Sequence, residues 1–450
     1  MSKKNIAIIL AAGKGSRMNS NIPKPLHKIA GKSIIEHILH NVKDAGYDES
    51  IIVLNKENEN FFKFLKENNP GLTFSYQKNQ LGTGDAVKEG VKEIDLSSVE
   101  NVLVVFGDTP LLSKKTLSNL ININDKNNIT VLGFETENPG RYGRLLVKDR
   151  KLLKIIEALD ANEEEQKITL CNGGIMIVKA DQLKENLNLL NNNNAKKEFI
   201  LSDLVEINNN SGGVSTYIEC DYEETIGIDS KKGLSKAEKI YQNKLRDKFM
   251  EAGATILDPE TVFFSHDTVI GKDVEIGSNI VFGENVLIKD NVEIKSFCSI
   301  ENSIINDGSS IGPFARLRNN VDIGKDSKIG NFVELKNSKL KQEVKISHLS
   351  YIGDAEIDDS VNIGAGTITC NYDGFNKHKT TIGKRAFIGS NSSLIAPINI
   401  GDDANVAAGS SISKDVDSKS LAITRAPIRF ISNWSKKFKK TSKEEEQCVE

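Results

Sequence analysis

A glycine-rich turn near the N-terminus carries the first residues that could do chemistry. The apolar segment 5–10 runs directly into LAAGKGSRM, residues 10–18. Gly13 and Gly15 allow backbone N–H groups to approach a phosphate closely, and Lys14 and Arg17 add positive charge. The spacing matches neither the P-loop nor the GxGxxG pattern. The turn therefore indicates a phosphate site, with a simple tight turn as the alternative.

Two further segments strengthen the phosphate interpretation. Lys24 lies in a proline-stiffened loop, PKPL, and QLGTG at residues 80–84 offers a turn of small residues at the start of an expected helix. Asp108 follows an apolar strand, at a position from which a Mg²⁺ ligand could reach a triphosphate. The alternative for Asp108 is a turn former or a helix cap.

A second group of polar residues lies between residues 316 and 409. Arg318 and Lys336 provide two cations that would suit a phosphate. His348 is one of six histidines, and an imidazole has a pKa suited to general-base catalysis near neutral pH. A single histidine is more often structural, but the Arg, Lys, Tyr and Asn residues around this one favour a functional role.

The first half of the chain must position the phosphate residues, and it alternates short apolar runs with longer mixed segments. Strands are expected at residues 5–10, 50–54, 72–77, 101–106 and 129–135, and helices at 32–45, 57–68 and 84–93. This alternation predicts an α/β, Rossmann-like nucleotide-binding domain with a mostly parallel sheet covered on both faces. In such a sheet a ligand lies beyond the carboxyl ends of the strands.

The second half of the chain consists largely of six-residue repeats. Aliphatic side chains recur at every sixth position, for example at Ile270, Ile276, Ile288 and Ile294. This is the period of a hexapeptide β-helix, in which each unit supplies one short strand and one corner. Residues about eighteen apart then stack, so that Arg318, Lys336 and, approximately, residues 371–372 could converge along one face. The insertion TCNYDGFNKHKT, residues 369–380, interrupts the repeat and is expected on the binding face.

The overall composition narrows the class of protein. Of the 450 residues, 59 are Lys or Arg and 62 are Asp or Glu, so the chain lacks the basic excess of a nucleic-acid-binding protein. Five scattered cysteines without a CxxC pair favour a reducing cytoplasm over a disulfide scaffold or zinc ribbon. No apolar run approaches the ~18–20 residues that membrane insertion needs. The expected boundaries are 1–231 for the first domain, 232–252 for an amphipathic linking helix and 253–450 for the β-helix.

The N-terminal motifs together resemble the sugar-phosphate nucleotidyltransferases, or nucleotide-sugar pyrophosphorylases. In that family LxxGxGxRM, a PKxL lysine and a GD pair after a strand occur in this order. The resemblance implies UTP and Mg²⁺, with Arg17 and Lys24 as catalytic residues and Asp108 and Asp229 as metal ligands. It also implies contacts to UTP or UDP-N-acetylglucosamine from Leu10, Ala11, Ala12, Gly13, Lys24, Gln77, Gly82, Thr83, Gly143, Glu157, Asn172 and Asp229.

The β-helix segments, above all NIGAGTITCNYD at residues 362–373, resemble the acetyltransferase half of a bifunctional bacterial family. This is the N-acetylglucosamine-1-phosphate uridylyltransferase/glucosamine-1-phosphate acetyltransferase family. It implies a left-handed parallel β-helix that forms a homotrimer, with acetyl-coenzyme A bound between subunits and His348 as the base. Glucosamine-1-phosphate would contact Arg318, Lys336, Tyr351 and Asn362, and acetyl-coenzyme A would contact Ala365, Asn371, Tyr372, Ser390, Ala408 and Arg425.

The resemblance spans nearly the whole chain and implies a cytoplasmic enzyme that makes UDP-N-acetylglucosamine, a precursor of peptidoglycan and lipopolysaccharide. Acetyl transfer to glucosamine-1-phosphate would come first, and uridylyl transfer from UTP, with release of pyrophosphate, would follow. Two alternatives remain open. One is a single-activity sugar-nucleotide pyrophosphorylase with a structural or regulatory β-helix, and the other is a non-enzymatic scaffold.

The sequence departs from the family pattern at a few positions. Asp229 stands where Asn is usual, which would give Mg²⁺ two carboxylates, although Asp229 could instead cap the linking helix. Asp85 follows the GTG turn where His is usual, and Gly173 stands where Thr is usual. Apart from Asp229, these departures look like neutral drift that affects only fine sugar specificity.

Overall fold

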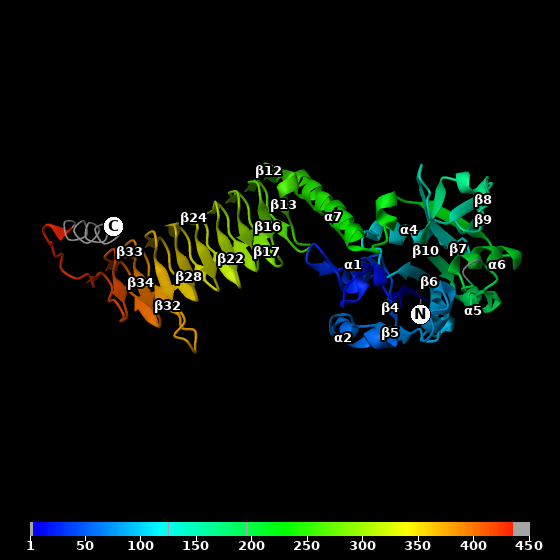
Figure 1. Cartoon of the computed structure of the whole chain (residues 1–450), viewed down its shortest axis with the longest axis horizontal. Coiled ribbons are helices and arrows are strands. Elements are labelled where there is room, and N and C mark those ends of the chain that lie inside the picture. Colours follow the sequence, from blue (N-terminus) through cyan, green and yellow to red (C-terminus); the bar gives the residue numbers. More distant parts are fainter. Residues whose placement is uncertain (1–2, 125, 195–196, 435–450) are drawn as a thin grey trace, which may run out of the picture. The chain divides into compact units, whose positions relative to one another are not determined.

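The computed structural model describes residues 3–124, 126–194 and 197–434. The chain divides into two compact units, Met1–Lys248 with Phe264–His266, and Phe249–Phe263 with Asp267–Glu450. The first unit is a helix-covered sheet and the second is a stack of short parallel strands (Figure 1). Both predicted fold classes are confirmed.

The sheet of the first unit follows the order β11-β7-β10-β6-β1-β4-β5. Neighbours are parallel except for β10, which is antiparallel to both β6 and β7. An antiparallel pair, β8 and β9, continues from β10, and β2 pairs separately with β3. The strands are β1 (Lys4–Leu10), β2 (Lys28–Ile29), β3 (Lys32–Ser33), β4 (Glu49–Leu54), β5 (Leu72–Tyr76), β6 (Val99–Phe106), β7 (Ile129–Glu135), β8 (Arg144–Lys148), β9 (Lys151–Ile156), β10 (Leu170–Lys179) and β11 (Ser215–Glu219).

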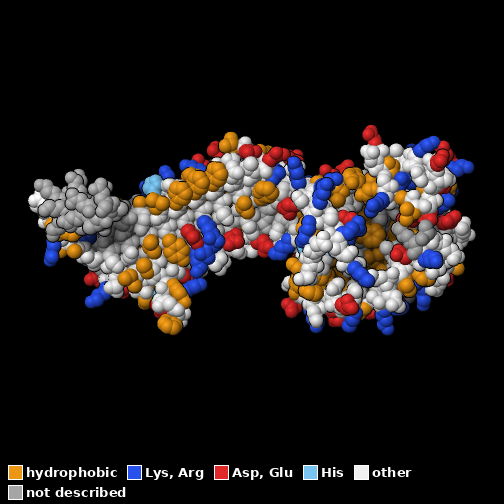
Figure 2. Space-filling view, in the orientation of Figure 1, with side chains coloured by type: hydrophobic (Ala, Val, Ile, Leu, Met, Phe, Trp, Pro, Cys, Tyr) orange, Lys and Arg blue, Asp and Glu red, His pale blue; other side chains and the backbone are white. Residues whose placement is uncertain are grey.

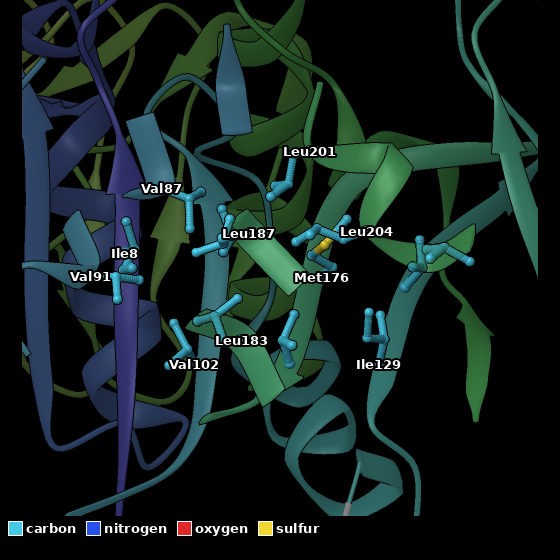
Figure 3. Packing of buried hydrophobic residues seen from close by; sticks show 14 of the residues in the cluster. Ile8, Val87, Val91, Val102, Ile129, Met176, Leu183, Leu187, Leu201 and Leu204 are labelled. Atoms are coloured by element: carbon cyan, nitrogen blue, oxygen red, sulfur yellow. The ribbon is translucent and has the colours of Figure 1, made fainter. Parts of the chain in front are cut away.

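Apolar faces of the helices bury this sheet. The helices are α1 (Ile34–Asp44), α2 (Glu59–Asn68), α3 (Thr83–Val91), α4 (Lys114–Asn124), α5 (Ala180–Leu189), α6 (Leu204–Asn210) and α7 (Lys231–Glu251). In Figure 3, Val91 of α3 lies beside Ile8 of β1, and Val87 of α3 belongs to the same buried cluster, together with Leu183 and Leu187 of α5. This hydrophobic cluster therefore lies between the sheet and the helices that cover it. The carboxyl ends of the strands lie outside it and continue into polar loops.

The five strands and three helices expected from the alternation are present, and no end differs by more than two residues. The sequence analysis did not anticipate β8 to β11 or α4 to α6. The reason is that β10 runs antiparallel between two parallel neighbours, which breaks the strand–helix alternation on which the prediction rested. Gly174 within β10 has a φ of +77°, and a Cβ there would lie 2.4 Å from the Phe106 ring.

The second unit is a three-sided prism, in which each side is a parallel sheet of 10, 9 or 8 strands. Its first sheet contains β12 (Thr255–Ile256), β15 (Glu275–Ile276), β18 (Glu293–Ile294), β21 (Ser310–Ile311), β24 (Lys328–Asn331), β27 (Lys345–His348), β30 (Asn362–Ile363), β33 (Phe387–Ile388), β36 (Asn405–Val406) and β38 (Leu421–Ala422). The second contains β13 (Val262–Phe263), β16 (Ile280–Phe282), β19 (Ser299–Ile300), β22 (Arg316–Arg318), β25 (Glu334–Lys336), β28 (Tyr351–Gly353), β31 (Ile368–Cys370), β34 (Ser393–Ile395) and β37 (Ser411–Ile412). The third contains β14 (Val269–Ile270), β17 (Val286–Ile288), β20 (Ser303–Ile305), β23 (Val321–Ile323), β26 (Lys339–Leu340), β29 (Ala355–Ile357), β32 (Thr380–Ile382) and β35 (Ile398–Ile400).

The six-residue repeat explains this left-handed β-helix directly. Ile276, Ile294, Ile311 and Ile329 are successive partners on one side of the prism, and all four side chains are buried. Many corners adopt a left-handed backbone, which asparagine tolerates better than most residues. The predicted insertion leaves the prism next to β32 (Figure 1) and is closed by a bridge between Tyr372 and Lys377.

The linking segment forms α7, as its apolar spacing predicts. Ala237 and Leu245 on this helix are buried, and the helix belongs to the first unit as far as Lys248. The four described cysteines, Cys171, Cys220, Cys298 and Cys370, are free thiols. Within the described ranges, no helix is both long enough and apolar enough to cross a membrane.

Candidate active sites

The glycine-rich turn borders a cavity of ≈270 Å³ at the carboxyl ends of β1 and β6. The cavity is lined by residues that the sequence analysis selected, namely Leu10, Ala11, Ala12, Gly13, Lys24, Gln77, Gly82, Thr83 and Asp108. Gln80, from the predicted QLGTG turn, also lines it, as does Glu198, which was not predicted. Gln80 donates a hydrogen bond of 2.6 Å to Ala12 O, which ties its loop to the glycine-rich turn.

Lys24 and Asp108 form an ion pair within this cavity. Lys24 Nζ lies 2.5 Å from Asp108 Oδ2, and both side chains are about four-fifths buried. Asp108 is placed there by a close approach of two strand ends, because a Cβ at Gly107 would lie 3.0 Å from Leu10 O. A charged pair is therefore held in the cavity at the carboxyl ends of two neighbouring strands.

The segment that carries Asp229 runs alongside Asp108. Ile228 N donates to Asp108 O over 2.9 Å, and a Cβ at Gly227 would lie 3.6 Å from Asp108 Oδ1. Asp229 Oδ2 lies 2.6 Å from Arg17 Nη1. At the start of α7, Gly233 N donates to the Ser230 hydroxyl over 3.2 Å. Ser230 thus supplies a cap to this helix, and Asp229 faces Arg17.

The donor set at this position suits Mg²⁺ together with substrate. No group of three or more His, Cys, Asp or Glu side chains among the described residues could hold a metal. Mg²⁺ usually takes one or two carboxylates and completes its shell with substrate phosphates and water. Asp108 and Asp229 fit that pattern, and the cations paired with them, Lys24 and Arg17, are the groups a triphosphate would attract.

The turn at residues 80–84 is held close to the cavity wall. Gly82 has a φ of +118°, and a Cβ there would lie 2.4 Å from Phe199 O. The buried Gln77 side chain donates from Nε2 to Gly82 O over 3.0 Å and to Asp85 Oδ2 over 2.8 Å. Gln77 and this turn therefore form one hydrogen-bonded unit.

The predicted sugar residues form a separate group that does not line this cavity. Asn172 N donates to Gly143 O over 2.8 Å, and a Cβ at Gly143 would lie 3.5 Å from Ile156 O, the residue before Glu157. Ser202 Oγ donates to Glu157 Oε1 over 2.9 Å. Burial, and then the charge of Glu157, raises the pKa of Asp203 to about 6.

In the second unit, His348 ends β27 at a corner of the prism. Its Nδ1 lies 2.5 Å from Asn331 Oδ1, the residue opposite it on β24. Since that oxygen is an acceptor, Nδ1 carries the proton and Nε2 keeps its lone pair. The imidazole is thereby held in the tautomer that a general base needs.

A row of exposed apolar side chains occupies the same corner on preceding coils. Phe297, Phe314 and Phe332 stack with ring centroids 4.9 and 5.0 Å apart, and Leu349 follows His348. All four residues have φ between 50° and 64°, which is unusual for bulky side chains, and all four are exposed. Figure 2 shows hydrophobic side chains gathered in rows on this unit. We call these four residues the corner row.

The predicted phosphate cations lie on a different corner. Arg318 pairs in register with Lys336, and Lys336 with Gly353. The Arg318 guanidinium contacts Glu334 over 2.7 Å. The inserted loop adds Lys377, which the sequence analysis missed. Contact with Lys377, followed by burial, lowers the pKa of Lys336 below its ordinary value.

The inserted loop is firmly built. Asp373 accepts hydrogen bonds from Phe375 N, Asn376 N and the His378 ring, and these hold its pKa well below the usual range. Asn371 donates to Asp354, which also accepts from Asn337. Tyr372 donates its hydroxyl proton to Gly374 O within the loop and is exposed.

Four of the predicted acetyl-coenzyme A residues, Ala365, Ser390, Ala408 and Arg425, follow the corner of His348, whereas Asn371 and Tyr372 lie in the inserted loop. Gly366 N donates to His348 O over 3.4 Å. Asn391 N donates to Ala365 O, and Gly409 N donates to Ser390 O, and both of these distances are 2.7 Å. A Cβ at Gly389 would meet Ala408 N, and one at Gly409 would meet the Arg425 side chain. Tyr351 lies opposite Glu334 on β25. Asn362, however, lies opposite Lys345, at the other end of β27 from His348.

Comparison with known proteins settles the family. Residues 7–172 match the model of a MobA-like NTP transferase domain. Residues 302–337 match the bacterial transferase hexapeptide model, and residues 379–414 match the hexapeptide repeat of succinyl-transferase. The chain is 46% identical over 427 residues to the bifunctional protein GlmU of Rhizobium rhizogenes, with 95% of this chain and 94% of that protein covered. It is 44% identical to GlmU of Ruegeria sp. over 93% of each chain, and 41% identical to GlmU of Zymomonas mobilis over 97% and 98%. The chain belongs to the bifunctional GlmU family.

Membership of the GlmU family decides between the alternatives left open by the sequence. The chain is a bifunctional enzyme of UDP-N-acetylglucosamine synthesis, with a nucleotidyltransferase half and a hexapeptide-repeat acetyltransferase half. The predicted family and the predicted pair of activities are therefore confirmed. The single-activity pyrophosphorylase and the non-enzymatic scaffold are not favoured.

Proposed function

We propose that uridylyl transfer takes place in the cavity of the first unit and acetyl transfer at the corner of His348 in the second. The observation that carries the first assignment is the Lys24–Asp108 pair at the carboxyl ends of β1 and β6. We assign residues 1–231 to the nucleotidyltransferase, 232–252 to the linking helix and 253–450 to the acetyltransferase.

In uridylyl transfer, a phosphate oxygen of N-acetylglucosamine-1-phosphate attacks the α-phosphorus of UTP. The new P–O bond forms as the bond to the β-phosphate breaks, and pyrophosphate leaves. No covalent enzyme intermediate is required, so the protein mainly positions the reactants and balances their charge. Lys24 and Arg17 exchange their carboxylate partners for phosphate oxygens. Asp108 and Asp229 would hold Mg²⁺, which when bound neutralises triphosphate charge.

The remaining residues of the first unit select substrate. The turn Leu10–Gly13 supplies backbone N–H groups to the phosphates, while Gln77, Gly82 and Thr83 contact the base. Gly143, Glu157 and Asn172 contact the sugar. Support comes from the hydrogen bonds that hold Gln77 to Gly82 and Asn172 to Gly143.

In acetyl transfer, His348 Nε2 accepts a proton from the amine of glucosamine-1-phosphate as the nitrogen attacks the acetyl carbonyl carbon. The C–N bond forms, the C–S bond breaks, and the proton taken by His348 passes to the leaving sulfur, so that coenzyme A leaves as the thiol. Asn331 keeps the proton of the imidazole on Nδ1, which favours Nε2 as the base. Arg318, Lys336 and Lys377 bind the sugar phosphate, with Tyr351 and Asn362 as further ligands. Ala365, Asn371, Tyr372, Ser390, Ala408 and Arg425 contact acetyl-coenzyme A.

We further propose that the acetyltransferase works as a homotrimer. His348, the Arg318–Lys336 pair and Asn362 occupy different parts of one prism, so a single chain does not gather them around one sugar. The corner row beside His348 presents bulky apolar side chains that a neighbouring copy would cover. Residues contributed by a second chain would then complete each site.

The substrates and chemistry also fit a cytoplasmic enzyme that acts without nucleic acid. UTP and acetyl-coenzyme A are small, charged metabolites, the described cysteines are free thiols, and the net charge is only −3.

One experiment tests the whole proposal. The enzyme is supplied with glucosamine-1-phosphate, acetyl-coenzyme A, UTP and Mg²⁺, and UDP-N-acetylglucosamine is measured. His348→Ala should make product only when N-acetylglucosamine-1-phosphate replaces glucosamine-1-phosphate. Product from glucosamine-1-phosphate at the wild-type rate in this variant would overturn the assignment.

A further inference from the structure

The amide of Gln77 is held in one orientation by two groups that can only accept hydrogen bonds. Its Nε2 lies 2.8 Å from Asp85 Oδ2 and 3.0 Å from Gly82 O. A carboxylate and a backbone carbonyl both need a donor, so the amide nitrogen, and not its oxygen, must face them. The orientation therefore follows from the chemistry of the two partners.

This arrangement leaves the amide oxygen of Gln77 as the free end. Among residues 3–124, 126–194 and 197–434, no protein donor bonds to Oε1, and Gln77 lines the nucleotide cavity. Gly82 O alone would leave the second N–H of Nε2 without its acidic partner. Asp85 thus adds to Gly82 O in keeping the amide from turning over, and it is the only one of the two that a substitution can remove.

We propose that Asp85 is a positioning residue that sets the choice of pyrimidine by fixing the amide of Gln77. Uracil carries a hydrogen on N3, which the fixed Gln77 carbonyl can accept. Cytosine has a lone pair on N3, which that carbonyl would repel. The inference rests on the proposed contact between Gln77 and the base, and it gives a function to a position where the sequence alone suggested neutral drift.

Asp85 also has a structural role, and the test must distinguish it from a role in base choice. It lies in the first turn of α3, where a carboxylate stabilises the partial positive charge of the helix N-terminus. Loss of that stabilisation would lower the thermal stability and would affect UTP and CTP alike. A role in base choice instead changes the ratio between the two nucleotides.

The experiment measures kcat/KM for UTP and for CTP in the full-length enzyme at saturating N-acetylglucosamine-1-phosphate and Mg²⁺. The variants are Asp85→Asn, which keeps the shape, and Asp85→Ala. In Asp85→Asn the new amide can donate to Gln77 Oε1 or accept from Nε2, so only Gly82 O still favours the native orientation and the flipped amide becomes more populated. Glu89→Gln is the matched control, since Glu89 is an acid of the same helix that pairs with Lys92 at the surface.

Both Asp85 variants should lower the UTP:CTP ratio by about tenfold, as expected when a buried hydrogen-bond match is lost. The KM for N-acetylglucosamine-1-phosphate and the ratio in Glu89→Gln should stay at wild-type values. A wild-type ratio in Asp85→Asn and Asp85→Ala, with the sugar KM preserved, would overturn the inference.

Gln77→Ala separates this inference from the function on which it rests. If Gln77→Ala lowers the ratio while the Asp85 variants do not, Gln77 reads the base without help from Asp85. If Gln77→Ala also keeps the wild-type ratio, the base is read elsewhere and the proposed role of Gln77 fails. Should Asp85→Ala not fold, the isosteric Asp85→Asn carries the test.

Discussion

Arg17 and Asp229 form an ion pair, with 2.6 Å between Arg17 Nη1 and Asp229 Oδ2. Both side chains are substantially exposed, and exposed pairs of this kind contribute at most about 1 kcal/mol. The pair can therefore be exchanged at small cost, the arginine for a phosphate and the carboxylate for a metal. Because Ser230 supplies a cap to α7, Asp229 is not needed for that purpose.

Asp229→Asn should raise the Mg²⁺ concentration required for half-maximal uridylyl transfer without abolishing the reaction. The amide oxygen still coordinates a metal, but one negative charge is lost. Asp108→Asn should be much more harmful, since Asp108 also pairs with Lys24 in the cavity. A Mg²⁺ titration of each variant checks both expectations. If Asp229→Asn overlays the wild type and only its stability falls, the residue has a structural role.

His348→Ala should reduce acetyl transfer by on the order of 10²–10⁴-fold, the usual contribution of a general base. Uridylyl transfer should stay near the wild-type rate, because the two halves have separate cores. Asn331→Ala should give a smaller loss and alter the pH profile, since Asn331 fixes the tautomer of His348. Separate assays of the two reactions measure this. Equal losses of both activities in folded His348→Ala would contradict the assignment.

Lys377→Met should raise the KM for glucosamine-1-phosphate by about tenfold, as expected when a charged contact to phosphate is removed. Lys377 lowers the pKa of Lys336, so the wild type should lose phosphate affinity on the alkaline side earlier than an ordinary lysine would. In the variant the pKa of Lys336 rises, and this alkaline limb should move to higher pH. The pH dependence of KM checks the shift, with exposed Lys339→Met as control. An unmoved limb would show that the two lysines do not interact.

If the proposed trimer is correct, Phe332→Asp should convert it to smaller species and abolish acetyl transfer while uridylyl transfer continues. A carboxylate placed between apolar side chains of two copies would have to be desolvated. Light scattering gives the oligomeric state, and Leu257→Asp, at an exposed apolar residue of the first coil, serves as control. A trimer with full acetyltransferase activity in Phe332→Asp would exclude the corner row from the interface.

The first unit should lose stability below neutral pH because of His37. Burial lowers the pKa of His37 to about 4, and the ring packs against Tyr241 and His266 and bonds to Ile29 O. Its folded pKa lies below the unfolded value, so the stability is fully present above about pH 6.5 and is lost as the pH falls towards 4. The full loss, reached below about pH 4, amounts to about 3 kcal/mol, of which about 2 kcal/mol is expected at pH 5.0. Urea inactivation of uridylyl transfer at pH 7.5 and 5.0 measures it, and His37→Gln should reduce the difference.

Local patterns in the sequence predicted the regular parts of both folds. The apolar run that ends at Leu10 predicts a strand, and the regular spacing of isoleucines from Ile276 onwards predicts the coils of a β-helix. Both patterns are local, so they predict these elements without knowledge of the rest of the fold. The antiparallel strand β10 could not be predicted in this way. Its position between β6 and β7 depends on contacts distant in sequence, such as that of Gly174 with Phe106.

The candidate sites were predictable to the extent that their residues lie in motifs. Lys24 and Asp108 belong to short, ordered motifs, and the structure brings them together. Lys377 has no such signal, because it lies in an insertion without periodicity and reaches Lys336 only through the loop fold. The hydrogen bond between Asp85 and Gln77 could not be predicted either. A turn brings the two side chains together, and spacing alone does not reveal a hydrogen bond.

In the second unit, backbone pairing between strands sets the positions of the site residues, and these positions do not depend on how well the core is packed. Arg318 and Lys336, or Asn331 and His348, are one coil apart, a step of about 4.8 Å that backbone hydrogen bonds determine. Smaller aliphatic side chains inside the prism would weaken the fold without stretching that step. Variants such as Ile329→Val should therefore melt at lower temperature and still turn over at the wild-type rate while folded, which makes the site's geometry a property of the backbone.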